Sequence, residues 1–177
     1  MACAPIVVST DFVEACIEEN QLVHVEDYLL KDAEGENRYS LQLREVLQRA
    51  KQNEGSLLRH HTILVTENVH GGFDTFKSII EANGGKCLLY KGRAGSLPTP
   101  RAGDEEESDM GAEPESVYLI SGATSQEVKL WPKFRQMGED AGLKPRIVRT
   151  DWLLDLALSQ QIKWDDMYKM TDDDIKV

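Results

Sequence analysis

From residue 60 to residue 161, short apolar runs alternate with segments in which apolar residues recur every three or four positions. Such runs are typical of buried strands, and the longer spacing is typical of helices packed on one face. The pattern predicts strands over 60–69, 86–90, 117–121 and 145–148, and helices over 73–83, about 124–141 and 150–161. Because parallel strands need crossover segments, this alternation predicts an α/β fold: a small parallel four-stranded sheet with helices on both faces.

Glycine and proline mark the boundaries of these elements. Gly71-Gly72 turns the chain into the first helix and Gly84-Gly85 ends it, because glycine adopts left-handed backbone conformations without steric cost. Pro132 predicts a kink or a late start in the second helix. In the sheet we expect four residues to lie side by side: Ile63, Leu88, Leu119 and Ile147.

An internal repeat at an offset of 140 residues is the most informative feature. Residues 5–17 match residues 145–157, and the match continues to Tyr28 over Tyr168. Each copy predicts a strand, a cap and a helix. We expect one apolar helix face to be buried in both copies. Its members are Phe12, Val13, Cys16 and Ile17 in the first copy, and Trp152, Leu153, Leu156 and Ala157 in the second.

The residues that precede each repeated helix predict its cap. Thr10-Asp11 and Thr150-Asp151 supply side-chain oxygens that accept hydrogen bonds from the first helical amides. Glu14, three residues after Asp11, completes a capping-box pattern in the first copy.

Composition divides the chain into three parts. Residues 1–30 hold the first copy, residues 31–56 form a linker with a helix over about 41–52, and residues 57–171 hold the complete α/β unit. Within the last part, residues 93–116 are rich in Gly, Pro, Ser and acids, which predicts a mobile insertion.

The net charge of -11 on 177 residues is unevenly distributed. Seven acids and no base lie between Asp104 and Glu115, whereas residues 127–149 hold six bases and three acids. This basic patch is either the solvated face of a helix or an anion site, and the sequence leaves both open. The acidic total disfavours direct DNA binding.

Several classes of protein are disfavoured by what the sequence lacks. It holds no apolar run of membrane-spanning length and no signal-peptide pattern, so we expect an intracellular chain with no membrane association. Cys3, Cys16 and Cys87 have neither disulfide-framework nor zinc-ligand spacing. Nucleotide-loop, hydrolase and metalloprotease motifs are absent, and the sequence alone assigns no Ser, Cys or Asp partner to any of the four histidines. We therefore expect no catalytic residue, metal or cofactor.

The arrangement of Gly84-Gly85 after one helix and Trp152 two residues after Thr150 in the last helix resembles the BRCT domain family. The resemblance covers about residues 60–168 as a whole repeat and residues 5–28 as the end of a preceding, truncated repeat. It is strongest to the C-terminal tandem repeats of fungal multi-BRCT DNA-damage scaffolds related to the PTIP proteins. It makes Phe12, Gly84, Gly85 and Trp152 structural anchors, and a ring at this position buries on the order of 150–250 Å².

The resemblance also implies binding residues. In tandem BRCT repeats, a Ser/Thr hydroxyl, a Gly amide and a Lys of the first repeat hold a phosphorylated residue. The corresponding positions in the complete repeat here are Thr66, Gly71 or Gly72, and Lys129. The groove that reads the downstream peptide, or the contact between repeats, would involve Asn68, Arg149, Leu154 and Leu158.

One difference between the copies bears on that groove. Glu14 and Glu18 of the first helix are replaced by Leu154 and Leu158, which lie one helical turn apart and off the Trp152 face. Apolar surface of this kind packs either on a partner repeat or on the helix predicted over 41–52, and the sequence leaves both open.

The function that the resemblance implies is a non-catalytic protein-interaction module of the nuclear DNA-damage response. Its partner would be a phosphorylated protein tail, with a phosphorylated histone as one candidate, together with other DNA-repair proteins. No cofactor is implied. The alternatives are an interaction module that does not depend on phosphorylation and, less favoured, a small α/β enzyme.

Overall fold

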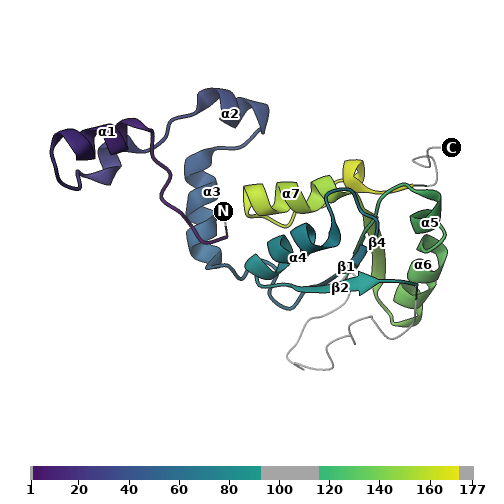
Figure 1. Cartoon of the computed structure of the whole chain (residues 1–177). Helices are drawn as coiled ribbons and strands as arrows, with labels where there is room; N and C mark the ends of the chain where they lie inside the picture. The colour runs from purple at the N-terminus through teal and green to yellow at the C-terminus, as the bar shows by residue number, and fades with distance from the viewer. Residues whose placement is uncertain (1, 93–115, 172–177) are drawn as a thin grey trace, which may run out of the picture.

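The computed structural model describes residues 2–92 and 116–171, so the acidic insertion expected at 93–116 lies outside the described residues except for Ser116. Four strands form one parallel sheet in the order β2-β1-β3-β4 (Figure 1). Their bounds are β1 (Thr62–Thr66), β2 (Lys86–Tyr90), β3 (Ser116–Ile120) and β4 (Lys144–Val148). The predicted fold class is confirmed. The row of aligned residues runs through Leu64 and not Ile63: Leu88, Leu64, Leu119 and Ile147.

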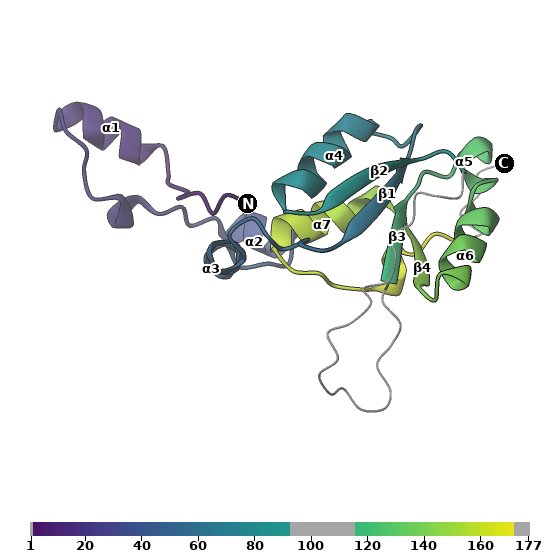
Figure 2. The same ribbon diagram turned by 90° about the horizontal axis from the view of Figure 1, so that it is seen from below.

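Helices cover both faces of the sheet (Figure 2). On one face α4 (Phe73–Ala82) and α7 (Thr150–Ser159) pack on the odd-numbered positions of β1 and on Tyr118 and Val148. On the other face α6 (Trp131–Asp140) packs on Leu64, Leu119 and Ile147. Because successive residues of a strand point to opposite faces, each strand supplies both cores.

The segment predicted as one helix over 124–141 is two helices. The short helix α5 (Ser125–Val128) precedes α6, and Pro132 lies in the first turn of α6, where its missing amide proton costs no hydrogen bond. Thr124 and Glu127 form a complete capping box at the start of α5.

The predicted caps of the repeated helices are wrong. The helix α1 (Asp11–Glu18) follows Thr10 and α7 follows Arg149, and neither residue's side chain caps its helix. In the first copy the Asp11 carboxylate instead accepts a hydrogen bond from the Ser9 hydroxyl, 3.3 Å away. The exposed first turn of α1 is accessible to water, which can satisfy its amides.

The main-chain hydrogen bonds of the two copies also repeat. The amide of Ser9 donates to the carbonyl of Tyr28 at 2.8 Å, and that of Arg149 to Tyr168 at 2.9 Å. The amide of Leu30 donates to Val7 at 3.0 Å, and that of Met170 to Ile147 at 2.9 Å. In each pair of bonds the two donor residues are 140 positions apart, and so are the two acceptor residues. The short 3-10 helices η1 (Val25–Tyr28) and η2 (Asp166–Tyr168) precede the returning chain in the two copies.

The two copies differ in how deeply their apolar residues are buried. Leu153 is fully buried, whereas its counterpart Val13 is 57% exposed and Ile17 is 73% exposed. The expectation of a buried stripe is therefore wrong for the first copy, because within the described residues α1 has no sheet beneath it. The predicted anchor Phe12 is half-buried and contacts Tyr28 edge to face, at 5.8 Å between ring centroids. In Figure 1 this unit projects away from the sheet.

Two helices connect this unit to the domain. The first is α2 (Ala33–Arg38), which the sequence pattern did not predict, and the second is α3 (Leu43–Asn53), close to the predicted linker helix. Asp32 caps α2 by accepting a hydrogen bond from the Gly35 amide at 2.9 Å. Val46 and Ala50 form the buried side of α3.

The predicted glycine anchors lie at a close approach of two segments. The helix α4 ends at Ala82, and Gly84 then adopts a φ of +80°. A Cβ on Gly84 would lie 2.8 Å from the Gly55 carbonyl oxygen, and one on Gly85 would lie 2.9 Å from Leu58 and Ile80. Only glycine fits at both positions without displacing these neighbours.

Trp152 is 1% exposed at the first turn of α7. Its ring stacks on Tyr118 of β3, with 4.5 Å between centroids and 15° between planes, and its Nε1 donates to the Lys163 carbonyl at 3.0 Å. The side chain therefore joins the sheet, the last helix and the chain that follows it.

We predict that Trp152→Ala lowers the free energy of unfolding by about 3–5 kcal/mol, since it removes a buried ring and leaves a cavity. Trp164→Ala is the matched control, because Trp164 is partly exposed and its stacking with Arg146 is worth at most about 1 kcal/mol. Urea unfolding followed by circular dichroism measures both. Equal losses in the two variants would contradict the anchor role.

Candidate functional site

The structure gives the three kinds of phosphate-binding candidate different surroundings. Thr66, at the end of β1, is buried, and its hydroxyl donates to the carboxylate of Glu127. Lys129 is exposed at the C-terminal end of α5. Gly71 and Gly72 have φ values of +99° and +84° in the turn that enters α4. A Cβ on Gly71 would lie 3.2 Å from the ring of Phe76, so this glycine also serves packing.

Glu127 occupies the place where a ligand would be expected. The sheet order reverses between β1 and β3, and the crevice beyond the carboxyl ends of such strands is the usual ligand site of open α/β sheets. The Glu127 carboxylate accepts hydrogen bonds there from the Thr66 hydroxyl, from the Gly122 amide at 3.1 Å and from the Thr124 hydroxyl at 2.7 Å. A further contact from the Thr124 amide is 3.4 Å long. A phosphate at Thr66 would meet this negative charge, so the geometry argues against the predicted phosphate pocket in this repeat.

The environment of Glu127 favours its charged form. Burial acts to raise its pKa, but hydrogen bonds from the hydroxyls of Thr66 and Thr124 and from the amides of Gly122 and Thr124 outweigh burial. The pKa is therefore held below the ordinary 4.5. The sequence signal for this residue was the Thr-x-x-Glu pattern at 124–127, which predicts a capping box but not the contact with Thr66.

The groove candidates follow β1 and β4 or lie on α7. Asn68 and Arg149 follow β1 and β4, and the carboxyl ends of parallel strands meet at the same edge of a sheet. The Asn68 amide contacts the Gln126 side-chain oxygen at 3.5 Å. Arg149 is half-buried at the start of α7, and Leu154 is 44% exposed on the next turn of that helix. Apolar surface and two hydrogen-bonding side chains thus lie in succession along this edge and α7.

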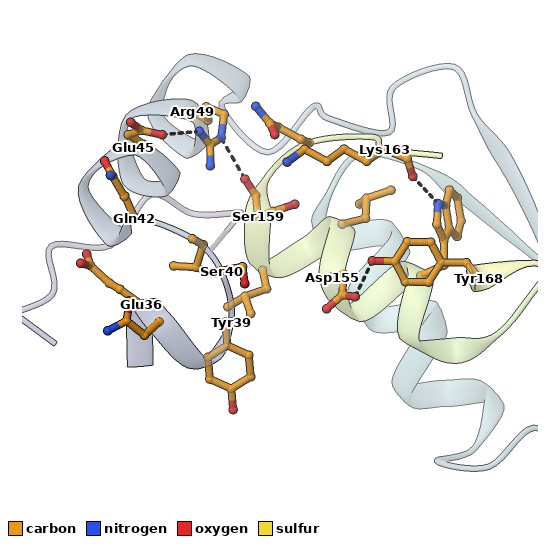
Figure 3. Close-up of a pocket in the computed structure, with 16 residues that line it drawn as sticks. Glu36, Tyr39, Ser40, Gln42, Glu45, Arg49, Asp155, Ser159, Lys163 and Tyr168 are labelled. Carbon is orange, nitrogen blue, oxygen red and sulfur yellow. Dashed lines mark hydrogen bonds and ion pairs between the residues drawn. The ribbon is translucent and has the colours of Figure 1, made fainter. Parts of the chain in front are cut away.

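Leu158 lies farther along, in the wall of a groove of about 800 Å³ between α7 and the segment 36–49 (Figure 3). We call this the α7 groove. Acids, bases and aromatic rings all line it: Glu36, Glu45, Asp155, Arg49, Lys163, Tyr39 and Tyr168. The Tyr168 hydroxyl donates to Asp155 at 2.6 Å, and that hydrogen bond, with a smaller effect of burial, raises the pKa of Tyr168 to about 12. The mixed lining suits a peptide better than an apolar small molecule.

Side chains of α3 fix the linker against the end of α7. Arg49 Nε donates to the Ser159 carbonyl at 2.9 Å, and Asn53 Nδ2 donates to the Gln160 carbonyl at 3.1 Å. Gln160 in turn donates to Asn83 at 3.0 Å. One expectation was that the linker helix would cover Leu154 and Leu158. In the structure α3 contacts only the last residues of α7 and the residue after it, and Leu154 remains exposed. The sequence pattern gave no signal for these polar contacts with main-chain carbonyls.

Among the described residues, no group of three or more His, Cys, Asp or Glu side chains is arranged to hold a metal ion. None of the helices in that part of the chain is long and apolar enough to cross a membrane.

No protein-family model matches the chain. BRCT-containing protein 1 of Schizosaccharomyces pombe is 34% identical over 89 residues, which make up 47% of this chain and 10% of that protein. PAX-interacting protein 1 of Bos taurus is 33% identical over 82 residues, 46% of this chain and 8% of that protein. The matched part thus spans about a tenth of the length of these curated relatives.

Solved structures share the fold. The crystal structure of the S. pombe Brc1 BRCT5-BRCT6 domains matches with a TM-score of 0.64 and 22% identity, covering 99% of this chain and 76% of that one. The complex structure of Rtt107p and phosphorylated histone H2A matches with a TM-score of 0.54 and 15% identity, covering 94% and 66%. The chain thus has the BRCT fold, with a four-stranded parallel sheet and Trp152 buried at the start of the last α-helix. The chain resembles the fungal multi-BRCT scaffolds and the PAX-interacting proteins, as predicted.

We predict that Glu127→Gln destabilises the domain at neutral pH, and that the difference from the natural chain shrinks as the pH falls below 4.5. A carboxyl whose pKa is lower in the folded state stabilises it above the unfolded pKa, and this is lost on acidification through the folded pKa. Urea unfolding at pH 7 and at acid pH measures the difference.

Glu67→Gln is the matched control, because Glu67 is exposed and forms only a surface ion pair with Lys91, at 3.1 Å. A loss for Glu127→Gln that stays constant across this pH range would contradict the assigned charge state.

Proposed function

We propose that this chain is a non-catalytic protein-interaction module of the nuclear DNA-damage response that binds a phosphorylated protein tail. In this proposal residues 57–171 form the second repeat of a tandem, and residues 5–28 form the closing strand and helix of the first. The observation that carries the proposal is the fold shared with Rtt107p, whose complex contains phosphorylated histone H2A. A phosphorylated histone tail is accordingly the first partner to test.

The exposed apolar residues of the first copy support the tandem. The two main-chain bonds that hold the returning chain in the second copy have equivalents in the first, yet Val13 is exposed where Leu153 is buried, and Ile17 is exposed as well. An apolar stripe of this size on a short helix is stabilised when a sheet covers it. A sheet equivalent to β1, β2 and β3, supplied by a complete first repeat, would provide that cover.

The two repeats then have different tasks. In the second repeat Glu127 fills the crevice at Thr66, so the phosphate would bind to the first repeat. Asn68, Arg149 and Leu154 of the second repeat would contact the peptide beyond the phosphate, with Leu158 and α3 fixing the end of α7. Phosphate recognition works through charge-assisted hydrogen bonds, and a neighbouring side-chain pocket adds sequence preference.

The rival functions make different predictions. A phosphorylation-independent module would bind modified and unmodified tails equally. An enzyme would need titratable groups that converge in a pocket. In the α7 groove the Tyr168 hydroxyl already donates to Asp155, and no histidine or cysteine is among the lining residues.

Calorimetric titration with a histone H2A tail peptide, phosphorylated and unphosphorylated, tests the proposal. The chain alone should bind both forms weakly. The chain with a complete first BRCT repeat joined ahead of residue 5 should bind the phosphorylated form at least about tenfold more tightly. Equal affinities for the two peptides in the extended protein would contradict phosphorylation dependence.

In that extended protein we predict that Leu154→Ala weakens binding of the phosphorylated peptide by about tenfold, because it removes an apolar contact of the groove. The matched control is Met167→Ala, since Met167 is 67% exposed and lies outside the proposed surface. Titrations of both variants give the comparison. An unchanged affinity for Leu154→Ala, or the same loss in both variants, would remove Leu154 from the binding surface.

A further inference from the structure

The C-terminal end of α7 is capped by residues that lie far from it in the chain. The last four carbonyls of a helix have no partner within it, and the helix dipole places partial negative charge there. The helix α7 has no basic residue in its last turn. Arg49 of α3 supplies a cation, because its Nε donates to the Ser159 carbonyl at 2.9 Å (Figure 3). The Asn53 side chain donates to the Gln160 carbonyl, 3.1 Å away.

The buried and hydrogen-bonded residues of α3 form one face of that helix. They recur at the spacing of three and four residues that places side chains on the same side: Val46, Arg49, Ala50 and Asn53. Val46 and Ala50 are fully buried, and the Arg49 side chain is 23% exposed. The Glu45 carboxylate lies 3.4 Å from Arg49 Nη1 and helps to orient the guanidinium. This face therefore combines apolar burial with hydrogen bonds that end on α7.

The residue that follows α7 extends the contact into the core. Gln160 has a φ of +55° and is 1% exposed. Its Nε2 donates to the Asn83 side-chain oxygen at 3.0 Å and to the Ala157 carbonyl at 2.8 Å. The Asn83 carbonyl accepts a hydrogen bond from the Leu58 amide at 2.7 Å. These polar groups thus join the ends of α4 and α7 to the chain between α3 and β1, and buried polar groups are costly to leave unpaired.

The same contact connects the two walls of the α7 groove. One wall is α7, and the other is the segment 36–49, which ends at Arg49. The chain runs from the first copy into the domain through α2 and α3. Coupling between two such parts is reciprocal, so whatever orders the end of α7 also favours the docked position of α3.

We propose that α3 is the C-terminal cap of α7, and that docking of α3 controls the order of the last turn of α7 and thereby the shape of the α7 groove. Arg49 is the positioning residue, and its guanidinium acts through the Ser159 carbonyl. Undocking of α3 leaves the end of α7 without a cation, so its last turn frays. This inference does not depend on the proposed binding of a phosphorylated tail.

Amide hydrogen exchange of the whole chain, read by NMR, tests the coupling in the variant Arg49→Met. This change keeps an apolar side chain of similar reach and removes the donor and the charge. Amides of α3 and of the last turn of α7 should exchange about tenfold faster than in the natural chain, and those of Leu64 and Leu119 in the sheet should be unchanged. Arg49→Lys should recover most of the protection in both helices, because its ammonium keeps a cation near these carbonyls.

The matched control is Arg44→Met, the same replacement at an exposed position of α3. It should change exchange at the end of α7 by less than about twofold. Faster exchange in α3 with α7 unchanged, no change in either helix, or an equal effect of Arg44→Met would overturn the proposal. So would a failure of Arg49→Lys to restore protection. Acceleration spread equally over the sheet would overturn it as well, because it would assign Arg49 to global stability. Circular dichroism verifies that all three variants are folded.

Discussion

The contact between Trp152 and Tyr118 is the interaction on which the rest of the domain depends. It fixes the start of α7 on β3, and the bond from Trp152 Nε1 to the Lys163 carbonyl fixes the chain that returns after α7. The candidate surface is built on these parts, because α7 forms one wall of the α7 groove. A single buried ring thus positions that surface.

The second constraint is the carboxylate of Glu127. Open parallel sheets bind ligands where the strand order reverses, and in this domain that crevice holds a carboxylate with three hydroxyl and amide donors within 3.1 Å. The hydrogen-bonding groups of the crevice are therefore paired with one another, and the Glu127 carboxylate there is negatively charged at neutral pH. Ligand binding by this domain is better supported on the α7 side, where Leu154 is exposed.

The sequence predicted the fold well because burial imposes a strict pattern on parallel strands and on the helices that cover them. It located the repeat because the pattern at Trp152 recurs at Phe12. It did not predict that the first copy is exposed, since burial depends on the sheet that covers a helix and not on the helix. Nor did it predict the contacts of Thr66 with Glu127 or of Arg49 with Ser159, because each joins residues far apart in the chain. The helix α2 was missed because it is short and lacks an apolar face.

The central claim is that the two copies are equivalent units and that a sheet covers the helix of the second copy but not that of the first. Amide hydrogen exchange tests this claim most directly. In this chain the amides of Arg149 and Met170 should exchange slowly, and those of Ser9 and Leu30 should exchange near the rate of an unfolded peptide. In the protein extended ahead of residue 5, Ser9 and Leu30 should become as protected as their counterparts. Slow exchange of Ser9 and Leu30 in this chain alone, or no gain in protection in the extended protein, would contradict the account.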